Sequence, residues 1–224
     1  MIGEAILLVG PIEVLKRLAE LMFEEEFWEN ILFTLKRITS GFLLAVALSL
    51  VTAPLSYRLG WFRSLMTPLV AALKATPVAS ITILLLVWIA SRNLSIAISF
   101  MMVFPIMHTT LEKALDEVDP RLVEMMDLYG VKGRKRIRYV YFSEVLPYFE
   151  SGVKSSLSLA WKSGIAAEVI AIPSGSIGEK LFEAKVYLST GDLFAWTILI
   201  VLLAFLFEKF FLFLLGLLRN ALEV

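Results

Sequence analysis

Long stretches without a charged residue constrain this chain more than any other feature of its sequence. Ile38–Tyr57 holds 20 residues without Asp, Glu, Lys or Arg, Ala75–Ser91 holds 17, and Leu94–Leu111 holds 18. An α-helix rises 1.5 Å per residue, so about 20 residues cross the roughly 30 Å hydrocarbon core of a bilayer. These windows therefore predict membrane-spanning helices, and a content of 58% hydrophobic residues argues against a soluble domain.

Two further segments, Pro147–Ile172 and Leu193–Leu218, are long enough to cross the bilayer although each contains charges. The first of these two is the least hydrophobic of the candidates. Together the windows predict an all-α polytopic membrane protein with five spans. The charged residues inside the last two spans are Glu150, Lys154, Lys162, Glu168, Glu208 and Lys209.

The composition excludes several classes of function. Lys and Arg number 21 and Asp and Glu also number 21, so there is no basic excess to hold a nucleic acid. The chain has no cysteine and a single histidine, His108, which argues against a thiol nucleophile and against a metal site. Because Glu168 is the one carboxylate deep within a predicted span, we expect neither a membrane-embedded enzyme nor a resident cofactor.

Residues 1–30 predict an amphipathic segment that precedes the transmembrane domain at 31–219. A helix over Pro11–Asn30 would place apolar residues at spacings of three and four on one face and charged residues on the other. Such a helix either lies along the membrane interface or packs on its own protein. The apolar face comprises Ile12, Leu15, Leu18, Ala19, Met22 and Phe23.

The distribution of Lys and Arg predicts the orientation of the chain. A five-span arrangement with the N-terminus outside places twelve of these residues in inner segments and seven in outer segments, with Lys74 and Lys162 within spans. Positive charge is retained on the cytoplasmic side of membrane proteins. We therefore predict an extracytoplasmic N-terminus, a cytoplasmic C-terminus and a cytoplasmic loop at 112–146.

This loop contains a short amphipathic helix in the sequence pattern. Asp119 is the expected N-cap, Pro120 the first helical residue and Gly130 the C-terminal stop. A helix of about three turns cannot bury an apolar face alone, so it packs on its own protein or enters a groove on a partner. The residues of that face are Leu122, Met125, Met126 and Tyr129, at positions i, i+3, i+4 and i+7.

The same loop resembles the cytoplasmic motif of ABC importer permeases. That motif reads Glu-Ala-Ala, three residues, Gly, nine residues, then Ile-x-Leu-Pro, and Glu124, Gly130 and Val140 keep its spacing. In that family the helix is a coupling helix that docks on the ATPase subunit. The resemblance thus implies coupling contacts at Leu122, Glu124, Met125, Met126, Tyr129 and Gly130. The departures from the motif are Met125 and Met126 for the alanines, Phe142 for Leu and Ser143 for Pro.

The resemblance extends from about Gly10 to Arg219. Ala72–Pro77 resembles the second core span of the family. Ser158–Trp161, Ala166–Ile170 and Ser174–Gly178 are most similar to the branch that imports nitrate, sulfonate, taurine and bicarbonate. Members of that branch usually start with one more span, whereas this chain opens at the segment that would follow it. The implied fold is a five-helix core of a type I ABC importer permease in the inner membrane, with a cytoplasmic coupling helix.

The resemblance also implies partners. Two permease chains would form a homodimer around the translocation path, an extracytoplasmic solute-binding protein would deliver the substrate, and a separate ATPase would bind ATP and Mg. The chain itself contains no G-x-x-x-x-G-K-[ST] phosphate loop. The expected substrate is a small anion such as a sulfonate, taurine or nitrate. A vitamin precursor or other heterocycle is an alternative, as is a secondary transporter or channel without an ATPase.

Ionisable residues within spans are costly, and they mark candidate positions on the path. Lys74 and Lys162 would attract an anion, and Glu168 would pair with a lysine or adjust the charge of the path. Structural pairing is the competing interpretation for all three. Lys162 and Glu168 are six residues apart, about 240° around one helix, so they are poorly placed to pair with each other.

Overall fold

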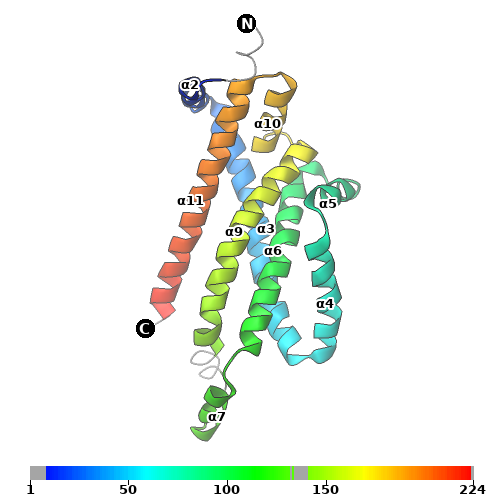
Figure 1. Cartoon of the computed structure of the whole chain (residues 1–224), viewed down its shortest axis with the longest axis vertical. Coiled ribbons are helices and arrows are strands. Elements are labelled where there is room, and N and C mark those ends of the chain that lie inside the picture. The colour runs from blue at the N-terminus through cyan, green and yellow to red at the C-terminus, as the bar shows by residue number, and fades with distance from the viewer. Residues whose placement is uncertain (1–8, 132, 134–140, 223–224) are drawn as a thin grey trace. The chain divides into compact units, whose positions relative to one another are not determined.

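The computed structural model describes residues 9–131, 133 and 141–222, and this part of the chain folds into nine helices and no strand (Figure 1). The motif residue Val140 lies outside the described residues. The helices are α2 (Pro11–Leu21), α3 (Glu25–Arg58), α4 (Gly60–Ala75), α5 (Val78–Leu85), α6 (Ser91–Asp116), α7 (Pro120–Leu128), α9 (Ser143–Ala171), α10 (Ile177–Val186) and α11 (Thr190–Leu222).

The chain divides into two compact units. The first unit comprises Met1–Gly41, Pro77–Ser99 and Ser158–Val224, and the second comprises Phe42–Thr76 and Phe100–Leu157. The long helices α3, α6 and α9 therefore each contribute residues to both units.

Close helix contacts hold the first unit together where α3, α6 and α9 meet. A Cβ atom added at Gly41 of α3 would lie 2.4 Å from the carbonyl oxygen of Ile96, and one at Gly164 of α9 would lie 2.6 Å from the Ile38 side chain. Gly41 is therefore required by the close approach of the α6 backbone, as is common for helix contacts inside membranes, whereas Gly164 leaves room for the Ile38 and Ser99 side chains. In the same region Ser99 donates a hydrogen bond of 3.2 Å to the Ala160 carbonyl.

The N-terminal helix is shorter than predicted. α2 ends at Leu21, and Glu25–Asn30 belong to α3 instead. Consecutive acidic residues explain the break, because Glu25 and Glu26 interact favourably with the positive N-terminal end of a new helix. The Trp28 indole donates a 3.0 Å hydrogen bond to the Met22 carbonyl and closes the turn between the helices.

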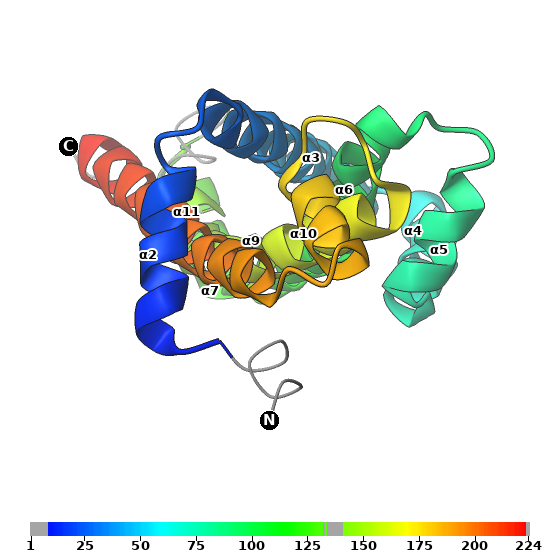
Figure 2. The ribbon, with the colours of Figure 1, turned by 90° about the horizontal axis from the view of Figure 1, so that it is seen from above.

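α2 lies across the beginning of α11, as Figure 2 shows from above. Val14 and Leu21 are buried, while most of the predicted apolar face remains exposed. One side of the helix therefore packs on the protein, and the placement of its exposed side at the membrane interface stays a prediction. The exposed fractions are 71% for Ile12, 58% for Leu15, 46% for Met22 and 91% for Phe23.

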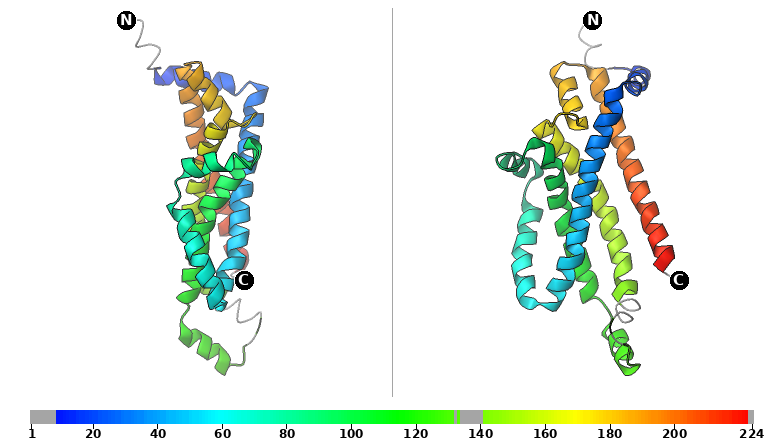
Figure 3. Two further views of the ribbon diagram at one scale, coloured as in Figure 1. Left: turned by 90° about the vertical axis from the view of Figure 1, so that its right-hand side faces the viewer. Right: turned by 180° about the vertical axis from the view of Figure 1, so that it is seen from behind.

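Polar contacts, buried at His108 and exposed at Arg63, join the helices of the second unit, in which α4 returns alongside α3 after a tight turn (Figure 3). His108 of α6 is 1% exposed, and its Nδ1 lies 2.9 Å from the Thr52 hydroxyl of α3. Arg63 of α4 forms ion pairs of 3.1 Å with Glu112 and 2.6 Å with Asp116 of α6. His108 is thus a packed residue within the protein.

The predicted second span, Ala75–Ser91, is not one continuous helix. α4 ends at Ala75, Thr76 is extended with φ −80° and ψ 124°, and α5 begins at Val78. Pro77 is the cause, because its ring disfavours the helical conformation at the preceding residue and it lacks a donor for the helix. The Thr76 hydroxyl donates a 2.7 Å bond to the Ala72 carbonyl and so satisfies one acceptor at the end of α4.

Among the described residues, three helices are long and apolar enough to cross a membrane, and a fourth is counted if α4 and α5 form one broken span. These three are α3, α6 and the Thr190–Leu217 part of α11. α9 has 29 residues and sufficient length, but it contains the charged residues noted in the sequence and does not meet the same apolar criterion. It is the predicted span with the weakest hydrophobic signal.

Candidate functional site

α7 is the short helix that the sequence predicted in the loop at 112–146. It begins at Pro120, and the Asp119 carboxylate accepts a hydrogen bond from the Arg121 amide at 2.8 Å. The loop is shorter than its predicted bounds, because Glu112–Asp116 continue α6 and residues 143–146 already belong to α9. Local capping signals therefore located this helix to within a residue at its C-terminal end.

The C-terminal end of α7 is a Schellman motif. The Val131 amide donates to the Met126 carbonyl at 2.9 Å, and the Gly130 amide donates to the Asp127 carbonyl at 3.1 Å. Gly130 has a φ of +66°, and a Cβ atom added there would meet nothing within 4 Å. Glycine is therefore required at this position by the backbone conformation and not by crowding.

No residue of α7 is buried within the protein. Met125 is 42% exposed and Tyr129 is 79% exposed, while Leu122 and Met126 are half-buried and Glu124 is exposed. Leu128, which the helical spacing did not place on the apolar face, is 88% exposed. α7 thus presents a partly apolar surface of Met125, Leu128 and Tyr129, and no residue in the described ranges buries it.

The three ionisable residues predicted within spans have different surroundings. Lys74, in the last turn of α4, is exposed and donates a 3.0 Å hydrogen bond to the Thr109 hydroxyl of α6 in the second unit. Lys162 of α9 is exposed and pairs with no carboxylate of the described residues. Glu168, six residues later in the first unit, is 0% exposed.

Glu168 does not pair with a lysine. Its Oε2 accepts a 2.8 Å hydrogen bond from the Thr34 hydroxyl of α3. The same hydroxyl oxygen accepts a 3.1 Å bond from the Ile177 amide at the start of α10. The Thr34 hydroxyl thus links α3, α9 and α10. Thr34, 134 residues from Glu168 in the sequence, is its partner in place of a lysine.

The beginning of α10 packs directly on α9 at Glu168. A Cβ atom added at Gly178 would lie 2.4 Å from the Glu168 Cβ and 2.5 Å from its carbonyl carbon. The loop before α10 includes Gly175 at φ +80° and Ile172 at φ 48°, the latter an uncommon conformation for a β-branched residue. Glu168 therefore anchors a tightly constrained turn into α10.

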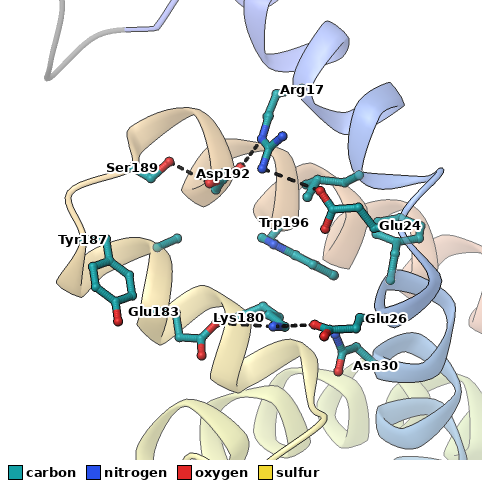
Figure 4. A pocket seen from close by; sticks show the side chains of 13 residues that line it. Arg17, Glu24, Glu26, Asn30, Lys180, Glu183, Tyr187, Ser189, Asp192 and Trp196 are labelled. Atoms are coloured by element: carbon teal, nitrogen blue, oxygen red, sulfur yellow. Dashed lines mark hydrogen bonds and ion pairs between the residues drawn. The ribbon is translucent and has the colours of Figure 1, made fainter.

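A pocket of about 200 Å³ lies at the other side of α10, among α2, α3 and α11 of the first unit (Figure 4). Arg17 pairs with Asp192, and Lys180 lies 3.1 Å from Glu26 and 3.4 Å from Glu183. Figure 4 shows Trp196 between these two clusters. No local sequence pattern reveals this pocket, because residues such as Glu26 and Lys180 in its wall are 154 positions apart in the sequence.

The ion pairs change the proton affinity of both cations in this pocket. The hydrogen bond that Arg17 donates to Asp192 raises the pKa of the guanidinium above its ordinary value. Burial alone would lower the pKa of Lys180, but the carboxylates of Glu26 and Glu183 outweigh burial and raise it. Arg17 and Lys180 are therefore firmly charged and attach α2 to α11 and α10 to α3. No group of three or more acidic or histidine residues in the described ranges is arranged to hold a metal ion.

Comparison with known proteins identifies the family. Residues 41–223 match the family described as the inner membrane component of binding-protein-dependent transport systems. A probable ABC transporter permease of Brucella melitensis is 27% identical over 92% of this chain and 83% of its own length. A putative aliphatic sulfonates transport permease of Bacillus subtilis is 24% identical over 92% of this chain and 75% of its own length. A riboflavin transport system permease of Chloroflexus aurantiacus is 26% identical over 92% of this chain and 79% of its own length.

These matches agree with the helical architecture and the apolar helices of the structure. The family is one of transport permeases and not of enzymes, and its members are multi-pass proteins of the inner membrane. The chain therefore belongs to the binding-protein-dependent transport system inner membrane components, and is an ABC importer permease of the branch that includes the sulfonate permeases.

Proposed function

We propose that this permease forms the translocation path of an ATP-driven importer and that α7 couples the path to a separate ATPase. The observation that carries the proposal is the exposure of Met125, Leu128 and Tyr129 on a helix with no buried residue. An apolar surface of this kind on a rigid, capped helix suits a groove on a partner protein. The ATPase would bind ATP and Mg, and the permease would transmit the movement.

The coupling residues in this proposal are Leu122, Glu124, Met125, Met126, Tyr129 and Gly130, joined now by Leu128. Leu122 and Met126 face partly inward and would hold α7 on its own unit. Met125, Leu128 and Tyr129 would enter the groove of the ATPase. Gly130 would fix the helix end, so that a displacement of α7 is passed to α9 as a rigid movement.

Co-purification and ATP hydrolysis test the coupling proposal. Leu128→Glu should place a charge in the apolar contact, and we expect a loss of tenfold or more in ATPase affinity. Phe23→Glu is the matched control, because Phe23 is 91% exposed and lies outside α7. Full retention of the ATPase and of transport-coupled hydrolysis by Leu128→Glu would contradict the proposal.

The path in this proposal uses Lys74 and Lys162, with Glu168 in a supporting position. The two lysines are exposed in the single chain and would face a path between two copies of the permease. Glu168 is fully buried and bonded to Thr34, so it would position α10 beside the path without contacting substrate. An extracytoplasmic binding protein would deliver the substrate. The N-terminus would lie outside and the C-terminus in the cytoplasm.

A small anion of the sulfonate type is the proposed substrate. The relatives named as aliphatic sulfonate permeases in Bacillus subtilis and Escherichia coli support this class. The riboflavin permease of Chloroflexus aurantiacus supports a heterocycle as the second candidate. Uptake of a labelled sulfonate and of riboflavin by the reconstituted complex separates the two. Lys162→Gln should slow the uptake of the sulfonate alone, since riboflavin carries no charge for the lysine to attract.

A further inference from the structure

A basic groove of about 490 Å³ runs between α3 and the start of α6 in the first unit. Three cations line it, Lys36, Arg37 and Arg92, together with a single carboxylate, Glu29. None of the three cations lies within 4 Å of a carboxylate in the part of the chain that the structure describes. The groove thus combines an excess of positive charge with open space.

Arg37 is held in place by contacts across the groove. Its Nη1 donates to the Arg92 carbonyl oxygen and, at 2.9 Å, to the Asn93 side-chain oxygen. Its guanidinium carbon lies 4.2 Å from the centre of the Phe33 ring, and that of Arg92 lies 5.9 Å from the same ring. Two guanidinium groups on one ring repel each other, and an anion between them would relieve this repulsion.

The groove lies where two apolar spans begin. Lys36 and Arg37 directly precede the charge-free stretch of α3, and Arg92 and Asn93 directly precede that of α6. On α3, Trp28 is 51% exposed and Leu32 is 50% exposed. Tryptophan and basic residues at the ends of apolar spans are typical of the level of the lipid headgroups. We therefore expect the cations of the groove at the depth of the phosphate groups.

We propose that this groove binds the phosphate group of an anionic phospholipid. Lys36 and Arg92 supply the charge that attracts the phosphate, and Arg37 and Asn93 fix the walls between them. Leu32 and Phe33 offer apolar surface for the start of an acyl chain. A free organic anion such as a sulfonate shares the same chemistry, but the exposed Leu32 and the position at the membrane interface favour a lipid.

Native mass spectrometry of the purified permease complex tests this proposal. The complex is equilibrated with equal amounts of phosphatidylglycerol and phosphatidylcholine, and the lipids that remain bound are counted. The intact protein should retain phosphatidylglycerol in preference. Lys36→Gln combined with Arg92→Gln should weaken that binding by about fivefold per charge removed. Lys36→Arg with Arg92→Lys keeps both charges and should keep the preference.

Lys185→Gln on α10 is the matched control, because it removes an exposed cation outside the groove and should change nothing. Arg37 is left intact, since its bonds join α3 to α6. Equal retention of both lipids by the intact protein, or an unchanged preference in the double glutamine variant with its fold intact, would overturn the proposal. Displacement of the bound lipid by millimolar ethanesulfonate would instead assign the groove to a substrate anion and would likewise overturn it.

Discussion

α7 and α10 are two short helices of nearly equal length, each set between long helices, and their surroundings are opposite. α7 has no buried residue, whereas α10 has Ile177, Gly178 and Ala184 buried. A glycine is needed at the end of one and at the beginning of the other, but for different reasons. A Cβ atom added at Gly130 would meet nothing within 4 Å, while one added at Gly178 would collide with the backbone of α9. α10 is therefore fixed by contacts with its own protein, whereas α7 presents exposed side chains.

The largest expected difference in stability is between Gly178→Ala and Gly130→Ala, each of which adds one methyl group. Gly178→Ala places a Cβ atom 2.4–2.6 Å from Glu168 and the Val169 amide, and neither backbone can move away easily. We expect a loss of about 3 kcal/mol or more in the free energy of unfolding. Gly130→Ala meets open space and should cost only about 1 kcal/mol, from its positive φ. Thermal unfolding in detergent compares the two, and equal losses would erase the distinction between the helices.

A second prediction separates fold from coupling at the end of α7. Gly130→Val disfavours the φ of +66° more strongly than alanine does, because a β-branched side chain rarely adopts that conformation. We expect an assembled permease with substrate-stimulated ATP hydrolysis reduced about tenfold. Met126→Glu should have the same effect by disturbing the inner side of the helix. Full stimulation in both variants would show that α7 does not transmit the movement.

The hydroxyl of Thr34 provides a third, smaller test on the side of α10. Thr34→Val removes the bond to Glu168 and leaves the Ile177 amide without its acceptor. Leaving buried polar groups unpaired should cost about 1–3 kcal/mol. Thr34→Ser retains the hydroxyl and is the control. For α7 the corresponding change is Asp119→Ala, which removes an exposed cap and should cost about 1 kcal/mol or less.

The smallest expected effect concerns the segment that leads into α7. The hydrogen bond that Tyr148 donates to Glu117 lowers the pKa of this exposed carboxyl below its ordinary value of 4.5. A lowered carboxyl pKa stabilises the contact at neutral pH, and that stabilisation is lost as the pH falls below about 4.5. Tyr148→Phe should raise the pKa of Glu117, as followed by an NMR titration of its side chain. An unchanged titration would show that the hydrogen bond does not persist in solution.

Local signals allowed much of this protein to be predicted. Asp119, Pro120 and Gly130 marked the ends of α7, because caps and positive-φ stops depend on residues a few positions apart. The charge-free windows located apolar helices for the same reason, since burial in lipid depends on composition over about 20 residues. Pro77 separates α4 from α5 for an equally local reason, because its ring disfavours the helical conformation at Thr76.

Contacts between distant segments were decided by the tertiary structure alone. Thr34 meets Glu168 across 134 residues, and Arg37 meets Asn93 across 56. No local pattern records such pairs, because each residue is compatible with its own helix whatever lies opposite. The sequence by itself therefore determined that apolar helices form and where α7 begins and ends. Only helix packing decided that Glu168 is buried against a hydroxyl and that three cations share one groove, since both depend on which faces come together.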